Sequence, residues 1–213
     1  MTYSDTPDPT RLPVKTRFLG GAVCLDFANT TEMLRSATPN DWLTSYEVLL
    51  VWSRARDTLS AGAIERLRRR DRQHPAAADE VFARSIAIRS DIRDLGLALA
   101  GGRVAADILR RINPRLAGLP PQPAIKAIRN RSYGRFALRG DRLDEPLWPI
   151  LWSLTALLTS PDAGRVGRCE GHGCGYLFID TTLNRSRRFC STEGCGNRTR
   201  VRRHYERQHS VSE

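Results

Sequence analysis

Four of the five cysteines lie close together in the last quarter of this 213-residue chain. Cys169 and Cys174 form one C-x4-C pair, and Cys190 and Cys195 form a second pair after fifteen intervening residues. Two short cysteine pairs at this separation are typical of a tetrahedral zinc site, because each tight turn presents two thiolates. An odd number of cysteines without a secretory signal argues against a disulfide framework. We therefore predict one structural Zn²⁺ on these four ligands.

The residues around the pairs favour the same interpretation. Glycine allows backbone amides to turn toward thiolates, and five glycines accompany the cysteines: Gly171, Gly173, Gly175, Gly194 and Gly196. His172 is expected to face solvent, because four cysteines already complete the ligand set. Four buried or reactive cysteines without a metal are the alternative that the residues alone leave open.

The chain between and after the pairs predicts a treble-clef-like finger. Gly175–Asp180 is apolar and aromatic and is expected to form a strand, with Arg187–Cys190 returning as its hairpin partner. The segment Asn197–Gln208 has a helical composition. The second cysteine pair then lies at the start of a helix, where the positive end of the helix stabilises thiolate charge.

Five arginines lie on this expected helix. At 100° per residue, Val201 and Tyr205 share a face that should pack on the hairpin. The polar positions are candidates for contacts with phosphates or guanine edges: Asn197, Arg198, Arg200, Arg202, Arg203 and Arg207. A solvated basic face is the alternative. In addition, zinc with four thiolates carries about −2, so some arginines are expected to neutralise the centre: Arg168, Arg188 and Arg198.

The segment from Cys169 to Gln208 closely resembles the bacterial CGNR zinc-finger family. The residues that give the family its name are Cys195-Gly196-Asn197-Arg198, and the block from Leu177 to Arg188 is also similar. Phe189 and Thr192 stand where the family commonly has Trp and Met. Neither position is a predicted zinc ligand.

The same resemblance implies an N-terminal partner, the ABATE domain of transcription regulators, matched here by the sequence from Gly20 to Thr30. Together with the arginine-rich helix, it favours the hypothesis of a bacterial transcription regulator whose finger contacts DNA and whose N-terminal domain senses a ligand or binds a partner. Asp26 and Asn29 are polar within this otherwise apolar stretch. Either they cap a helix, which is commoner, or they line a small-molecule pocket. Cys24 is expected to be a small buried core residue.

Periodicity predicts a mainly α fold with a small hairpin in the larger domain. A capping box at Thr44–Glu47 and Ser60 are expected to open the first two helices. The remaining expected elements are helices over 76–100, 104–112 and 144–158 and a hairpin over 124–139. The expected organisation is a flexible segment over 1–13, a helical domain over 14–160, a linker over 161–168 and the finger over 169–209.

Composition narrows the functional class. The net charge is +11, and residues 165–213 carry 10 basic and 5 acidic side chains in less than a third of the length. This excess suits a polyanion such as DNA. With no membrane span and no leader, we expect a cytoplasmic protein. The sequence leaves the oligomeric state open; a homodimer is one possibility, since a single finger reads only a few base pairs. We expect no enzyme, because no catalytic motif is present and four thiolates saturate the zinc. Alternatives are a protein-interaction module with a structural finger, and RNA binding.

Overall fold

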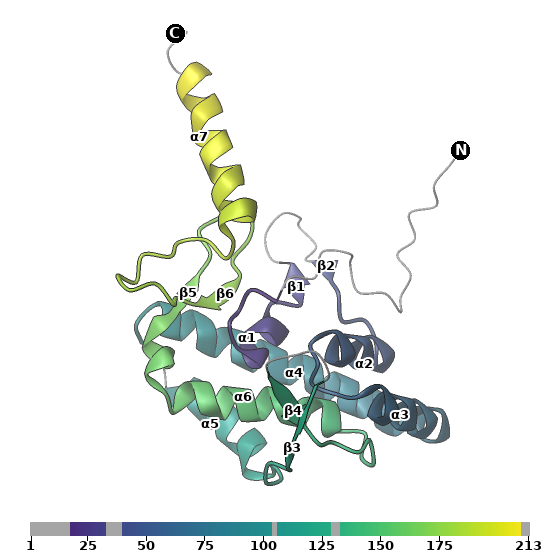
Figure 1. The fold of residues 1–213 in the computed structure, drawn as a ribbon. Helices are drawn as coiled ribbons and strands as arrows, with labels where there is room; N and C mark the ends of the chain where they lie inside the picture. Colours follow the sequence, from purple (N-terminus) through teal and green to yellow (C-terminus); the bar gives the residue numbers. More distant parts are fainter. Residues whose placement is uncertain (1–17, 33–39, 104–105, 129–132, 210–213) are drawn as a thin grey trace, which may run out of the picture.

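The computed structural model describes residues 18–32, 40–103, 106–128 and 133–209 (Figure 1). The expected flexible segment 1–13 lies outside these ranges. The helices are α1 (Val23–Ala28), α2 (Tyr46–Ala55), α3 (Ala61–Gln73), α4 (Pro75–Ala100), α5 (Ala106–Ala117), α6 (Trp148–Leu158) and α7 (Asn197–His209). Three antiparallel pairs join β1 (Thr31–Glu32) with β2 (Asn40–Asp41), β3 (Ile125–Ala127) with β4 (Gly134–Phe136), and β5 (Val166–Arg168) with β6 (Leu177–Ile179). Within the described residues, every helix falls short of the length and apolarity that crossing a membrane requires.

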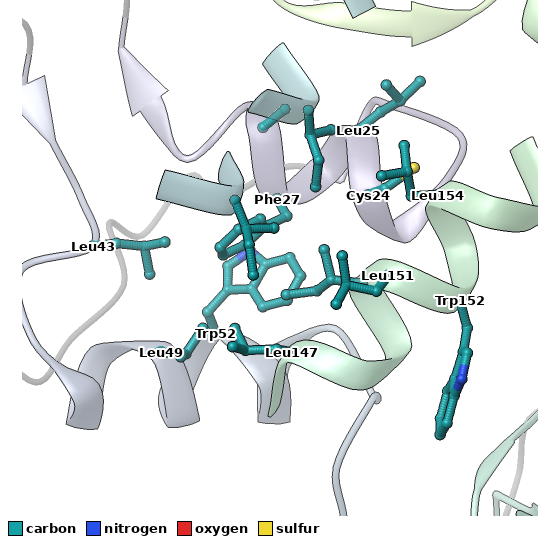
Figure 2. Close-up of a cluster of buried hydrophobic side chains, with 14 of the residues drawn as sticks. Cys24, Leu25, Phe27, Leu43, Leu49, Trp52, Leu147, Leu151, Trp152 and Leu154 are labelled. Carbon is teal, nitrogen blue, oxygen red and sulfur yellow. The ribbon is translucent and has the colours of Figure 1, made fainter. Parts of the chain in front are cut away.

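The predicted fold class is confirmed: the chain is mainly helical, with small hairpins and a C-terminal four-cysteine finger. The short helix α1 lies at the centre and packs on α4 and α6. Figure 2 shows Trp52 of α2 directed into this core against Phe27 of α1. Their rings meet edge to face with centroids 5.2 Å apart, and both side chains are fully buried. The elements therefore converge on an aliphatic and aromatic core.

The finger shares this core with the helical domain. Val166, Leu177 and Ile179 of β5 and β6 belong to the same buried cluster as the helices. Gly96 of α4 lets Leu177 approach closely, since a Cβ at that position would lie 2.4 Å from Leu177 Cδ1. The helical part and the hairpin of the finger therefore form one packed body.

Two predicted helix starts are close to those observed. The side chain of Ser60 accepts a hydrogen bond from Ala63 N (3.1 Å) and caps α3 as expected. Helix α2 is capped by Ser45, one residue after the predicted Thr44, through a bond from Val48 N. The hydroxyl that reaches the third residue of the helix decides the boundary.

Several predicted boundaries are wrong. Pro114 lies inside α5, which continues to Ala117 instead of ending at 112. The interval 161–168, expected as a linker, contains a 3₁₀ turn (Pro161–Arg165) and strand β5. Strand β6 is present as predicted, but its partner is β5 and not Arg187–Cys190. The first knuckle, which carries Cys169 and Cys174, therefore forms the turn of the hairpin.

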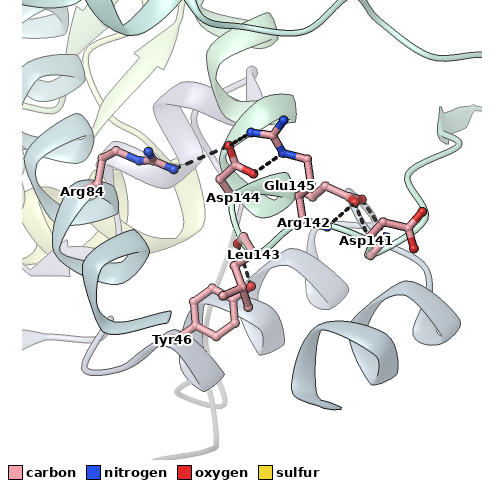
Figure 3. Close-up of polar contacts among 8 residues, drawn as sticks. Tyr46, Arg84, Asp141, Arg142, Leu143, Asp144 and Glu145 are labelled. Atoms are coloured by element: carbon pink, nitrogen blue, oxygen red, sulfur yellow. Dashed lines mark hydrogen bonds and ion pairs between the residues drawn. The ribbon is translucent and has the colours of Figure 1, made fainter. Parts of the chain in front are cut away.

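A buried carboxylate holds the loop that leads into α6, and Figure 3 shows its contacts. Glu145, only 3% exposed, accepts hydrogen bonds from the backbone N–H groups of Gly140 (2.7 Å), Asp141 and Arg142. Gly140 has a φ of +80° and presses against Ala63 of α3, so a side chain does not fit there. One carboxylate thus holds the loop over 140–142 against the 3₁₀ turn (Glu145–Leu147) that precedes α6, while Gly140 brings the loop against α3.

We expect Glu145→Ala to lower the free energy of unfolding by about 2–4 kcal/mol, because charge-assisted hydrogen bonds to buried amides are lost. Urea unfolding followed by circular dichroism measures this change. Glu80→Ala, at an exposed position of α4, is the matched control and should change stability by less than about 0.5 kcal/mol. Equal midpoints for the two variants would contradict the role of Glu145.

Candidate metal centre and nucleic-acid interface

The four cysteines predicted to bind zinc converge on one point. Their Sγ atoms all lie within 4.8 Å of one another, although the residues come from two separate turns. Cys169, Cys190 and Cys195 are buried, and Cys174 is partly buried. Among the described residues this is the group of side chains suited to holding a metal ion.

The spacing of the sulfur atoms fits tetrahedral zinc. Cys190 Sγ lies 3.6 Å from Cys174 Sγ and 3.7 Å from Cys195 Sγ. A tetrahedron with Zn–S bonds of about 2.3 Å has S···S edges of about 3.8 Å. The thiols thus lie where the vertices of a zinc tetrathiolate would be, with a fully protein-derived ligand set that suits a structural site.

Hydrogen-bond donors lie around two of the sulfur atoms, those of Cys169 and Cys195. Cys169 Sγ accepts hydrogen bonds from the backbone N–H groups of Cys190 (3.2 Å) and Gly171 (3.4 Å). Thiol hydrogen bonds from Cys174 and Cys190 and these amides lower the pKa of Cys169. Arg198 donates to Cys195 Sγ at 3.0 Å, which confirms that one of the basic side chains expected to neutralise the centre does contact it.

Glycines in the first knuckle are required by close packing and backbone conformation. A Cβ on Gly171 would lie 2.8 Å from Cys195 Cβ, so only glycine allows the two turns to meet. Gly173 and Gly175 have φ values of +67° and +64°. His172, between Gly171 and Gly173, is exposed, as expected. The knuckle is therefore shaped to bring the sulfurs together.

Comparison with protein families agrees with this geometry. The CGNR zinc-finger family matches residues 165–208, and the ABATE family, described as "putative stress-induced transcription regulator", matches residues 21–161. The chain belongs to the ABATE family. A search of the curated proteins found no match. Below, residues 21–161 are called the ABATE domain and residues 165–208 the CGNR finger; the four clustered cysteines are the zinc site of that finger.

Helix α7 of the CGNR finger carries the six candidate nucleic-acid residues and projects away from the body of the molecule (Figure 1). Asn197 is exposed at its first position. The expectation that Val201 and Tyr205 pack on the hairpin is wrong, because they are 47% and 59% exposed. The apolar side of the hairpin faces the ABATE domain instead, which leaves α7 accessible around its circumference.

The structure divides the five arginines of α7 into two groups. Arg198 contacts the zinc site, and Arg202 forms an ion pair with Glu206 at 3.3 Å. Arg200, Arg203 and Arg207 lie along one side of the helix and line a cleft of about 870 Å³. The other residues of the cleft are Thr182, Ser186, Arg187, Arg188, Phe189, Thr192, Gly196, Thr199 and Glu206. Five arginines and one glutamate give this cleft a formal charge of +4.

Two residues that the sequence did not single out shape the cleft. Asp180 accepts hydrogen bonds from Thr182 N (2.8 Å) and Arg187 N (2.9 Å), which fixes the loop between them. The Arg187 guanidinium stacks on Phe178 with 4.3 Å from Cζ to the ring centroid, and it donates to Cys190 O at 2.6 Å. Arg187 therefore ties the loop to the second knuckle, a role that only the folded contacts reveal.

The two residues considered for a ligand pocket have other partners. Asp26 accepts hydrogen bonds from Gly20 N and Arg56 Nε, both 2.8 Å, and burial raises its pKa. Asn29 follows α1 and pairs with both backbone groups of Leu177, donating to its carbonyl and accepting from its amide at 2.8 Å each. The Asn29 side chain thus makes the two backbone hydrogen bonds that a neighbouring strand would make with Leu177, and it joins the ABATE domain to the CGNR finger.

Cys24, the remaining cysteine, occupies the core as expected. It is fully buried on α1, and its backbone N–H donates to Ser153 of α6 at 3.2 Å. Burial raises the pKa of its thiol to about 11. At neutral pH the side chain is a protonated, apolar packing group.

Proposed function

We propose that this protein is a bacterial transcription regulator that binds DNA through its CGNR finger. The observation that carries the proposal is the alignment of Arg200, Arg203 and Arg207 along one side of a projecting helix, over a cleft of formal charge +4. The description of the ABATE family supports a regulatory and non-catalytic role.

The shape of the finger suits a DNA groove. The major groove is about 12 Å wide and admits a single α-helix. Helix α7 is exposed along its described side chains, so it can enter a groove without unfolding any other element. Guanidinium groups bind phosphates and the O6 and N7 atoms of guanine. The hydroxyls of Thr182, Ser186 and Thr199 in the same cleft add donors for phosphate oxygens.

Each arginine has an assigned part in this proposal. Arg200, Arg203 and Arg207 contact DNA from the cleft, and Asn197 approaches it from the start of the helix. Arg202 lies on another side and adds a phosphate contact, while Arg198 acts mainly on the zinc site. One finger reads only a few base pairs, so the proposal includes a homodimer on a two-fold symmetric site.

The ABATE domain is the sensing or partner-binding part in this proposal. A pocket of about 240 Å³ supports an effector site, and it lies between α6, the β3–β4 hairpin and the end of α2. Phe136, Pro149 and Trp152 form apolar walls. Asp26 and Asn29 do not line this pocket, so the effector site proposed here replaces the one expected from those residues.

The proposal is tested by selecting random duplex DNA with the zinc-loaded full-length protein. We expect a defined, symmetric site to be enriched. The triple variant Arg200→Glu, Arg203→Glu and Arg207→Glu should no longer enrich a defined site. For its residual binding, the slope of the logarithm of the binding constant against the logarithm of the salt concentration should correspond to about three fewer phosphate contacts. The matched control makes the same change at three exposed positions of α3: Arg69→Glu, Arg70→Glu and Arg72→Glu.

Three outcomes would overturn the proposal. Loss of selection in both triple variants would make the effect one of total charge and not of the cleft. Preference for duplex or single-stranded RNA in a side-by-side measurement would make the protein an RNA-binding module. No nucleic-acid binding at all would favour a protein-interaction module with a structural finger.

A further inference from the structure

Arg93 of α4 is a cation buried between the ABATE domain and the CGNR finger. The residue is only 8% exposed. Its Nη2 donates to the carbonyl of Gly175, which directly follows the zinc ligand Cys174, at 3.4 Å. Its Nε and Nη1 atoms are buried and have no hydrogen-bond partner. A guanidinium with two of its three nitrogens unsatisfied is costly, since such groups are normally fully paired.

No carboxylate pairs with Arg93 in the part of the chain that the structure describes. The neighbouring Asp94 forms an ion pair with Arg111 at 2.7 Å. The nearby Asp41 is bound to the guanidinium of Arg89. Arg89 and Arg168 are themselves positive, and burial together with Arg168 lowers the pKa of Arg93. Among the described residues Asp94 acts on Arg93 only through space, so a further negative group near Arg93 is needed to balance the buried charge.

The zinc site provides such a group. Four thiolates and one Zn²⁺ carry a net charge of about −2. Arg198, on the finger's own helix, contacts Cys195 Sγ and balances one of these charges. The carbonyl of Gly175 connects Arg93 to the first knuckle. Of the other arginines expected to neutralise the centre, Arg188 pairs with Glu170, and Arg168 lies on the finger near Arg93. Arg93 adds a cation from the ABATE domain that reaches the first knuckle.

We propose that Arg93 is the second counter-cation of the zinc tetrathiolate, so that zinc affinity of the CGNR finger depends on a residue of the ABATE domain. Arg93 acts through the field at the centre and binds no metal itself. When zinc leaves, sulfurs of the site take up protons and the negative charge near Arg93 decreases. Zinc binding and docking of the two parts therefore stabilise each other. This inference does not depend on DNA binding.

The test measures zinc affinity of the full-length protein by competition with a chromophoric chelator. We expect Arg93→Met, which keeps the length of the side chain and removes the charge, to weaken zinc binding about 10- to 100-fold. Arg93→Lys, which keeps the charge, should recover much of this loss. Arg84→Met, on the same helix but paired with Asp144, is the matched control and should leave zinc affinity unchanged.

A second measurement separates this role from simple packing. Urea unfolding of the zinc-free and zinc-loaded forms should show that Arg93→Met destabilises the loaded form more than the zinc-free form. Equal destabilisation of both forms with unchanged zinc affinity would overturn the proposal. So would a loss in Arg93→Lys as large as in Arg93→Met. If Arg93→Met gives no folded protein, Arg93→Gln carries the same expectations, and the thiolate-to-metal absorption of the Co²⁺ form reports whether the site is assembled.

Discussion

We expect that removing zinc unfolds the CGNR finger and also destabilises the ABATE domain. Structural zinc supplies about 10–16 kcal/mol in isolated fingers, far more than so small a unit gains from its own core. Here Leu177 and Ile179 of β6 are part of the helical core, and Leu177 packs directly over Gly96 of α4. Loss of the knuckles therefore releases side chains that cover α4. Chelation or Cys190→Ser should shift the unfolding midpoint of the whole chain and expose α4 amides to hydrogen exchange.

Cys24→Ala is the control for this prediction. It removes a buried thiol outside the zinc site, so the protein should retain one zinc per chain and lose only packing energy. The coupling would be disproved if the chelated protein kept its protease resistance and its α4 amides exchanged as slowly as before. Unfolding of the finger alone, with an unchanged ABATE domain, would show that the shared core contributes little.

Asn29→Ala should be among the most damaging substitutions outside the zinc site. The amide of Asn29 satisfies both the N–H and the C=O of Leu177 at 2.8 Å. Alanine leaves these two backbone groups buried without partners, at roughly 1–3 kcal/mol each, or about 2–6 kcal/mol together. Urea unfolding of the zinc-loaded protein gives this number.

Asn184→Ala, an exposed asparagine of the same finger, is the matched comparison and should stay within about 0.5 kcal/mol of the parent. A similar small effect for Asn29→Ala would mean that water or backbone movement replaces the lost amide, and that the link between α1 and β6 is not a main source of stability.

Local signals predicted local structure well. The side chain of Ser60 caps α3 because a hydroxyl three residues before a helical amide is nearly sufficient to set the boundary. The cysteine pairs and their glycines predicted the zinc site, since thiolate chemistry tolerates few other arrangements. Pro114 misled the prediction because α5 tolerates it three residues before its last residue, Ala117.

Contacts between distant segments could not be read in the same way. Strand β5 has only three residues, one of them Gly167, and gives almost no strand pattern. Val201 and Tyr205 form an apolar pair on α7, yet they stay exposed because the apolar side chains of the hairpin pack in the core of the helical domain. Asn29 was recognised as an unusual polar residue, but its partner Leu177 lies 148 positions away. Sequence spacing carries no information about such a pairing.

The packed seam between α4 and β6 also limits how this architecture can be recombined. A cut between residues 161 and 165, where the two family matches meet, would leave Leu177 and Ile179 without cover on one piece and Gly96 facing water on the other. A chimera that exchanges only the finger must therefore keep the close contact between Gly96 and residue 177 and the two hydrogen bonds that Asn29 makes with that residue. In evolutionary terms the CGNR finger and the ABATE domain should diversify together, because both must fit the surface of α4.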